Sequence, residues 1–140
     1  MKISTKGRYA LRLMLELAQN YGKCKNTNIK EIAATQEISP KYLEQLIHPL
    51  VKAGFVKSTR GSQGGYTLCQ PPQYYTVGMI LRLMEGDLAP APCLGKEAAP
   101  CSRQSGCPSA VLFRKIQQAV DQVIDSTTLS DLLEEGPKEN

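Results

Sequence analysis

Three of the five cysteines, Cys93, Cys101 and Cys107, fall within one stretch of 15 residues. Thiolates are soft ligands that suit iron–sulfur clusters and zinc. A zinc ribbon requires close C-x-x-C pairs, which this spacing lacks, whereas widely spaced cysteines in an irregular loop suit a chain that wraps around a bulky cluster. We therefore expect these three residues to be metal ligands. Reversible disulfide chemistry and three thiols without a function are the alternatives.

A second set of polar side chains lies on a predicted helix at residues 40–53. Ser39 followed by Pro40 is typical of a helix N-terminus, and leucines then recur at helical spacing. The candidate site residues of this helix are Lys41, Tyr42, Glu44, Gln45 and His48. Glutamine can pair with adenine, and glutamate can accept a hydrogen bond from the amino group of cytosine. This face therefore has the chemistry that reads bases in a major groove.

A basic, glycine-rich turn at residues 60–65 separates two predicted strands, at 55–59 and 66–68. Arg60, beside the flexible Gly61, has the reach to enter a minor groove, and hydroxyl groups suit phosphates. The candidate DNA contacts of this hairpin are Ser58, Arg60, Ser62 and Gln63. Near the N-terminus, Lys2 and Arg8 are further candidates, and Lys6 and Arg12 add positive charge.

The charge of the chain is unevenly distributed. Residues 1–70 contain 11 Lys and Arg against four Asp and Glu, a balance of +7, whereas residues 71–140 contain six against nine, a balance of −3. A basic half joined to a mildly acidic half favours contact between the first half and a polyanion.

The elements that must position these residues are mainly helical. Apolar periodicity and capping residues predict helices at residues 7–19, 29–36, 40–53, 77–85, 108–126 and 129–133. The second and third helices form a helix-turn-helix, and the hairpin after them forms a wing. Pro49 should kink or shorten the third helix near its end. Residues 86–108 are a long irregular loop that holds the cysteine cluster.

Composition excludes several classes of protein. With 140 residues, 41% hydrophobic and 21% charged, the sequence is that of a folded soluble chain without a membrane span. No signal peptide is recognisable, so we expect a cytoplasmic protein. Cys24 and Cys69 lie outside the cluster, and five cysteines without an export signal argue against a disulfide scaffold. His48 is the only histidine, and no nucleophile–base pair can be assembled, so we expect no enzymatic activity.

Four motifs in this order resemble the IscR-type winged-helix regulators of the Rrf family. They are KGRYA at residues 6–10, ISPKYLEQL at 38–46, RGSQGGY at 60–66 and the three-cysteine loop before a long helix. The resemblance covers nearly the whole chain. It implies a mainly α fold with a small β-hairpin, in which a winged helix-turn-helix domain precedes a long dimerisation helix. The corresponding regions are residues 1–70 for DNA binding, 71–108 for the linking helix and cluster loop, and 109–140 for dimerisation.

The resemblance also implies a function and a ligand set. Members are homodimeric bacterial transcription factors that bind double-stranded DNA, and a dimer should recognise a pseudo-palindromic operator. Glu44 and Gln45 match base-reading positions, and Arg60 matches the minor-groove arginine of the wing. Cys93, Cys101 and Cys107 match the ligands of an iron–sulfur cluster, more often 2Fe–2S than 4Fe–4S. The ligand histidine of IscR members corresponds to Ala110 here, which leaves the fourth ligand unassigned.

The main hypothesis is therefore a transcription regulator that senses iron–sulfur cluster status. The alternative retains DNA binding but replaces the cluster with a thiol switch, in a regulator of cysteine and sulfur metabolism. A third hypothesis, a small electron carrier, would need neither the wing nor the basic half of the chain, and it predicts no salt-dependent affinity for DNA.

Overall fold

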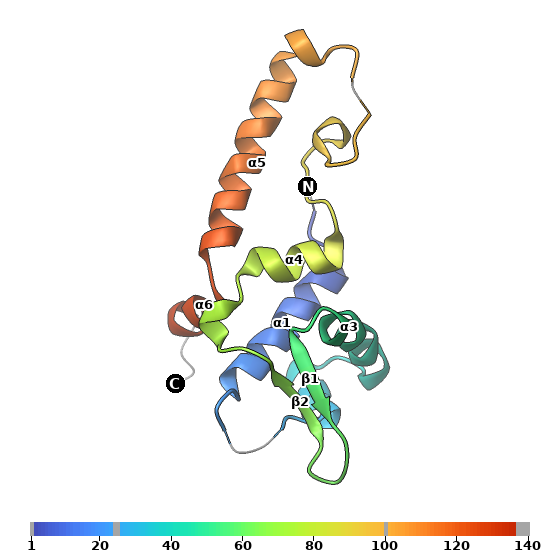
Figure 1. The fold of residues 1–140 in the computed structure, drawn as a ribbon, viewed down its shortest axis with the longest axis vertical. Helices are drawn as coiled ribbons and strands as arrows, with labels where there is room; N and C mark the ends of the chain where they lie inside the picture. The colour runs from blue at the N-terminus through green and yellow to red at the C-terminus, as the bar shows by residue number, and fades with distance from the viewer. Residues whose placement is uncertain (1, 24–25, 100, 137–140) are drawn as a thin grey trace.

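The computed structural model describes residues 2–23, 26–99 and 101–136 of the chain (Figure 1). Within these residues the chain forms six α-helices, one two-stranded antiparallel hairpin and three short 3-10 turns. In chain order they are α1 (Thr5–Gln19), α2 (Ile29–Gln36), α3 (Pro40–Lys52), β1 (Val56–Thr59), β2 (Gly65–Leu68), η1 (Pro72–Tyr74), α4 (Val77–Glu85), η2 (Pro92–Leu94), η3 (Gln104–Gly106), α5 (Pro108–Ser126) and α6 (Leu129–Glu135). The predicted class, a winged helix-turn-helix followed by a long helix, is confirmed.

The helix ends follow local capping, as the sequence predicts. The side chains of Asn28, Ser39 and Thr76 accept hydrogen bonds from the first-turn amides of α2, α3 and α4. Two helix bounds differ from the prediction by two residues: α1 begins early because Ser4 caps it, and α6 continues to Glu135. Pro49 lies inside α3 and does not shorten it, because the helix continues to Lys52. Among the described residues other than glycine, Glu37 alone has a positive φ, 55°, and it ends α2 in the left-handed conformation.

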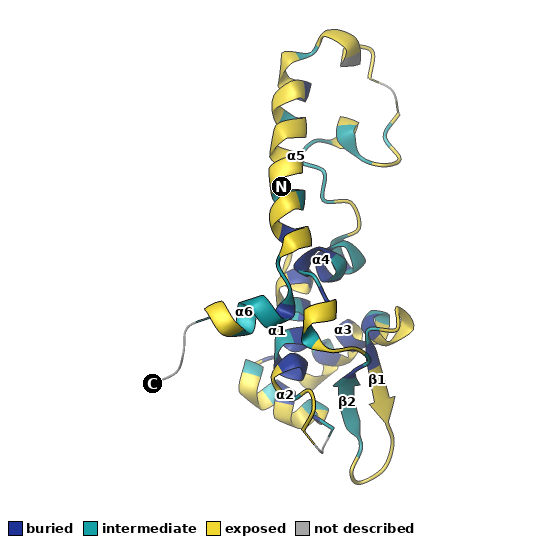
Figure 2. Cartoon of the chain, turned by 60° about the vertical axis from the view of Figure 1, so that its left-hand side comes forward, coloured by how far each residue is buried: buried dark blue, intermediate teal, exposed yellow. Residues whose placement is uncertain are grey.

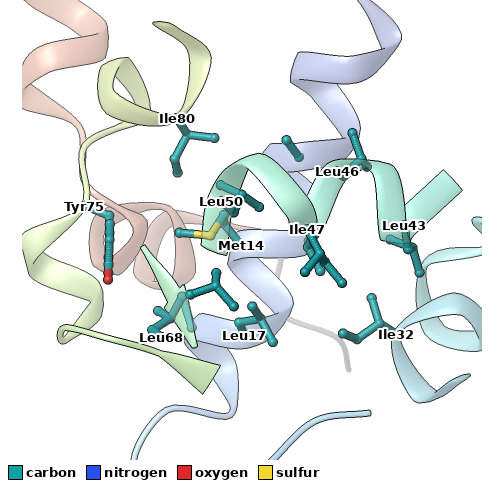
Figure 3. Close-up of a cluster of buried hydrophobic side chains, with 14 of the residues drawn as sticks. Met14, Leu17, Ile32, Leu43, Leu46, Ile47, Leu50, Leu68, Tyr75 and Ile80 are labelled. Carbon is teal, nitrogen blue, oxygen red and sulfur yellow. The ribbon is translucent and has the colours of Figure 1, made fainter. Parts of the chain in front are cut away.

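The core of the molecule lies between α1, α3, α4 and the hairpin (Figure 3). Met14 and Leu17 of α1 contact the apolar face of α3, on which Leu43, Leu46 and Leu50 are at most 1% exposed. Leucine burial of this extent contributes about 2 kcal/mol per side chain. Because one face of α3 is fixed in the core, its opposite face is the one presented to solvent.

Tyr75 fastens the base of the hairpin to the start of α4. Its ring is fully buried, and its hydroxyl donates to the carbonyl oxygen of Phe55 at 2.8 Å. The hydroxyl oxygen of Tyr75 also accepts a hydrogen bond from the main-chain amide of Gln70 at 3.0 Å. Burial raises the pKa of this phenol above its ordinary value of about 10.

The long helix α5 extends away from the winged half, and much of its length is exposed (Figure 2). The chain leaves the end of α4, passes through the cysteine loop and α5, and returns beside the start of α4. The return is closed by two main-chain bonds, from Val77 N to Thr127 O at 2.9 Å and from Leu129 N to Tyr75 O at 3.0 Å. No helix in the described part of the chain is long and apolar enough to cross a bilayer.

Candidate functional site

The outer face of α3 carries four of the predicted base-reading residues side by side. The side chains that line one shallow hollow on this face belong to Lys41, Glu44, Gln45 and His48, and all four residues are exposed. Two adjacent helical turns thus present a cation, a carboxylate, an amide and an imidazole to solvent. These are the groups that hydrogen-bond to base edges and phosphates.

Tyr42, the fifth candidate on α3, is only half exposed because its ring packs against α1. The rings of Tyr42 and Tyr9 meet edge to face, with their centroids 5.9 Å apart. This contact aligns the first turn of α3 with α1, and the hydroxyl of Ser39 caps the same turn by accepting from the amide of Tyr42 at 3.2 Å. The ring of Tyr42 thus helps to position α3 against α1.

Arg12 makes contacts within the fold that the sequence does not predict. Its guanidinium lies 5.1 Å from the centroid of the Tyr9 ring and donates to both the side chain and the main-chain carbonyl of Gln36. Gln36 in turn donates to the carboxylate of Glu16 at 2.9 Å. Arg12 therefore ties α1 to the end of α2, while its positive charge stays exposed at the surface.

The hairpin forms an exposed wing with the predicted turn at its tip. Val56 and Leu68 pair at its base and are buried, and the register then brings Thr59 opposite Gly65. The predicted contact residues are all exposed, namely Ser58, Arg60, Ser62 and Gln63. Arg60 makes no ion pair with any residue that the structure describes, so its guanidinium is available to a phosphate or a groove.

Lys2 and Arg8, the remaining candidates, lie at the N-terminus of α1. They line a shallow hollow that they share with Ser4, and both are exposed. The amide and hydroxyl of Ser4 donate to one carboxylate oxygen of Glu85 at 2.9 and 2.7 Å. The end of α4 therefore holds the start of α1 in place.

The cysteine loop is irregular, as predicted, and its thiols are accessible. Cys93 and Cys101 are exposed, and Cys107, which immediately precedes α5, is half exposed. All three are free thiols, as is the half-buried Cys69 at the end of β2. Cys24 lies outside the described residues.

Asp87 folds the first part of this loop back on itself. One carboxylate oxygen accepts from the amide of Ala89 at 2.8 Å, and the other accepts from the amide of Lys96 at 2.9 Å. These bonds favour the ionised form and hold the pKa of Asp87 below its ordinary value. The loop around Cys93 thus has a defined shape, although the thiol itself remains open to solvent.

The thiols have the chemistry of cluster ligands, but they are not gathered into a site. Within the part of the chain that the structure describes, no three His, Cys, Asp or Glu side chains lie close enough together to hold a metal ion. A cluster would have to draw Cys93, Cys101 and Cys107 together from separate parts of the loop. The arrangement therefore does not fit a preformed cluster site.

Helices α4 and α5 are joined by a charged clamp above a small apolar cluster. Arg82 donates to Asp121 at 2.9 Å and to both carboxylate oxygens of Asp125. Val77, Leu81 and Ile124 are buried beneath it. This junction connects the winged half to the long helix, and the sequence did not predict the clamp because its partners are about 40 positions apart along the chain.

An apolar stripe along α5 remains exposed. Leu112, Ile116 and Val123 follow helical spacing and are 55%, 39% and 62% exposed. Nothing in the described part of the chain covers them. An exposed stripe of this length on a helix is typical of a surface that pairs with another helix.

The chain is similar to known transcriptional regulators over almost its whole length. Residues 3–135 match the sequence model of the Rrf2 family, described as an iron-dependent transcriptional regulator. The HTH-type transcriptional regulator CymR of Bacillus subtilis is 48% identical over 132 residues, which cover 94% of this chain and 89% of that protein.

Solved structures with the same fold agree with this match. The structure described as CymR, the global cysteine regulator of B. subtilis, superposes with a TM-score of 0.80 at 44% identity, covering 98% of this chain and 99% of that one. The structure of T. potens IscR gives a TM-score of 0.79 at 36% identity, covering 100% of this chain and 94% of that one.

Proposed function

The chain belongs to the Rrf2 family of transcriptional regulators, and on that premise we propose that it reads double-stranded DNA with α3 and the wing and regulates cysteine or sulfur metabolism through its thiols. The observation that supports DNA reading most directly is the combination of two exposed surfaces. One is the polar face of α3, and the other is the exposed Arg60 at the wing tip. Helices of this kind place their first turns in a major groove, and a wing extends the contact to the adjacent backbone.

We assign a separate role to each of three consecutive segments of the chain. Residues 1–70 bind DNA, 71–108 carry the linking helix and the thiols, and 109–140 form the dimer. The stripe of Leu112, Ile116 and Val123 supports a homodimer, because pairing two copies of α5 would remove this apolar surface from water. A dimer presents two copies of α3, which favours an operator with two inverted half-sites.

Selection of tight-binding duplexes from a random-sequence pool tests the DNA-binding part of the proposal. We expect the full chain to enrich a pseudo-palindrome, and we expect its affinity for the enriched duplex to fall steeply with salt. No enrichment, with no binding even at low ionic strength, would contradict the proposal.

Thiol sensing is favoured over a cluster by two observations. A thiol switch needs only two accessible thiols, and Cys93 and Cys101 are free and exposed; the similar B. subtilis protein is also described as a global cysteine regulator. Two thiols that form a disulfide release two protons and two electrons, which a peroxide can accept. Such a bond would reshape the loop between α4 and α5.

The test compares DNA affinity before and after treatment with hydrogen peroxide, with recovery in dithiothreitol. We expect a reversible change of about tenfold, the scale of a typical coupling between two sites. Cys93→Ser or Cys101→Ser should abolish the response, whereas the matched control Cys69→Ser, outside the loop, should preserve it. A wild-type affinity that is indifferent to peroxide would exclude the thiol switch.

Cluster sensing is the second candidate function. It is favoured by the iron-dependent description of the family and by the likeness to T. potens IscR. Cys93, Cys101 and Cys107 would be its ligands, with 2Fe–2S preferred to 4Fe–4S. Anaerobic incubation with iron and sulfide would then produce charge-transfer absorption at roughly 320–430 nm. Absence of that absorption in the wild type would exclude this candidate and leave the thiol switch standing.

A further inference from the structure

We propose that Asn26, in the connection between α1 and α2, is a positioning residue for the wing tip and thereby for the contact of Arg60 with DNA. This inference rests on the proposed DNA-binding function and extends it to a segment that precedes the helix-turn-helix. Asn26 itself need not touch DNA. It acts through the backbone of the wing.

The connection before α2 pairs with the wing through a single antiparallel β-bridge between Thr27 and Tyr66. Thr27 N donates to Tyr66 O at 3.0 Å, and Tyr66 N donates to Thr27 O at 2.8 Å. Gly65 makes this close approach possible, because a Cβ there would lie 2.6 Å from Thr27 O and its φ of +151° disfavours a side chain. The second glycine of the Gly64-Gly65 pair is therefore explained by the close approach of Thr27 at this bridge.

Thr27 is itself fixed to the body of the molecule. It is only 2% exposed, and its hydroxyl accepts from the side-chain amide of Asn20, just beyond α1, at 3.0 Å. The connection is thus anchored on one side to α1 and on the other to β2. A side chain on this segment has a rigid base from which to hold the wing.

Asn26 extends this hold to the wing tip. Its side-chain Nδ2 donates to the carbonyl oxygen of Gln63 at 3.2 Å. Within the described residues, this hydrogen bond links a side chain outside the hairpin directly to the turn at 60–65. The turn closes on itself through one main-chain bond, from Gly64 N to Gly61 O at 2.9 Å.

A turn with three glycines loses much conformational freedom when it is fixed on DNA. This entropy loss weakens binding unless a contact within the free protein has already ordered the turn. The hydrogen bond from Asn26 orders the turn before DNA binds, because it fixes the carbonyl group of Gln63, three residues after Arg60. Its loss should lower DNA affinity by roughly three- to tenfold, the effect of one net hydrogen bond.

The test is a double-mutant cycle measured by fluorescence anisotropy on the duplex selected with wild-type protein. Asn26→Ala and the near-isosteric Asn26→Asp are each combined with Arg60→Ala and, as a matched control, with Lys41→Ala on α3. Thermal unfolding of every variant checks that the fold is retained. Two substitutions at position 26 guard against a defect specific to one of them.

We expect both Asn26 variants to lose affinity and to show little further loss when Arg60 is already alanine. The effects of Asn26→Ala and Lys41→Ala should add, because Lys41 lies on α3 and not in the wing turn that Asn26 contacts. Wild-type affinity in the Asn26 variants, additivity with Arg60→Ala, or equal coupling to Lys41→Ala would each overturn the inference. Loss of binding in Arg60→Ala and Lys41→Ala without loss in the Asn26 variants would leave the proposed function intact.

Discussion

At the scale of single residues, the proposed interface contains two kinds of side chain with separable effects. Arg60 is an exposed cation on the wing, whereas Gln45 is an amide on the outer face of α3. A cation that neutralises a phosphate strengthens binding to any duplex, because it releases a counterion. An amide that pairs with a base edge distinguishes one sequence from another.

Arg60→Ala should therefore weaken binding to every duplex and reduce the slope of log K against log salt by about one. Gln45→Ala should instead relax preference at one position of each half-site, at a cost of about 1–3 kcal/mol on the preferred base. Salt titrations on the selected duplex and on single-base variants of it measure both effects. A loss of base preference in Arg60→Ala with an unchanged salt slope would reverse these assignments.

Tyr75 supports a prediction about stability and pH. Tyr75→Phe removes the hydroxyl that donates to Phe55 O and accepts from Gln70 N. It should cost about 1–2 kcal/mol at pH 7 because two part-buried hydrogen bonds are lost, although Phe55 O keeps its bond from Cys69 N. Burial raises the folded-state pKa of the phenol, so its contribution is complete below the unfolded value of about 10 and declines as pH rises above it.

Urea unfolding followed by circular dichroism from pH 7 to 11 checks this prediction. The difference in unfolding free energy between wild type and Tyr75→Phe should narrow as the pH passes about 10. The exposed Tyr74, when replaced by phenylalanine, serves as the control and should show neither effect. A constant difference across this range would mean that Tyr75 ionises equally readily in the folded and unfolded chains.

At the scale of elements, the junction of α4 and α5 determines how the wing and the long helix sit relative to each other. Asp125 accepts two hydrogen bonds from Arg82, and this pairing lowers the pKa of the carboxyl. A depressed pKa means that the clamp stabilises the fold above about pH 4 and loses its contribution as the carboxylate is protonated in acid.

Asp125→Asn should lower the free energy of unfolding at pH 7 by about 1 kcal/mol, a value limited by solvent screening because the two side chains are 35% and 47% exposed. The deficit should shrink below about pH 4 as the wild-type carboxylate becomes neutral. Glu134→Gln, which neutralises an exposed carboxylate of α6, is the control. An equal deficit at pH 3 and pH 7 would show that charge is not what holds the junction.

The elements that could be predicted from sequence are those specified locally. Ser39-Pro40 marks the start of α3, and the leucine spacing identifies its buried face, because both signals act within a few residues. The pairing of Thr27 with Tyr66 and the clamp of Arg82 with Asp125 could not be predicted, since each joins positions about 40 apart along the chain. The sequence therefore predicted what kind of site the chain carries, but it did not predict the long-range contacts that position the site.

The cysteine loop is another segment whose chemistry the sequence predicts but whose conformation it does not. The spacing of Cys93, Cys101 and Cys107 identifies a group with thiol chemistry, but it does not specify how the loop folds. Asp87, which the pattern did not single out, fixes the loop by bonds to two amides. Residue type thus predicted which chemistry is available, whereas tertiary hydrogen bonds determine whether the thiols meet.

At the scale of the whole molecule, the two ends of the chain have to act together. The winged half carries the positive balance, and the long helix projects from it with its apolar stripe uncovered (Figure 2). In the proposed mode of binding, a single wing and α3 contact one half-site. Pairing two chains through α5 would make the second half-site contact effectively intramolecular, which would raise the overall affinity without any new kind of contact.

Val123→Glu places a charge in this stripe at its most exposed large side chain and should therefore separate the dimer without disturbing the monomer core. Affinity for a duplex with two half-sites should fall by about 100-fold, whereas affinity for a single half-site should be unchanged, because only the second contact depends on pairing. Sedimentation velocity measures the oligomeric state, and anisotropy on the two duplexes measures the affinities. Gln118→Glu adds the same charge on another side of α5 and should leave the oligomeric state and the affinities for both duplexes unchanged. If Val123→Glu remained dimeric, or if it became monomeric and lost affinity equally for one and two half-sites, α5 would not be the element that links the two DNA-reading surfaces.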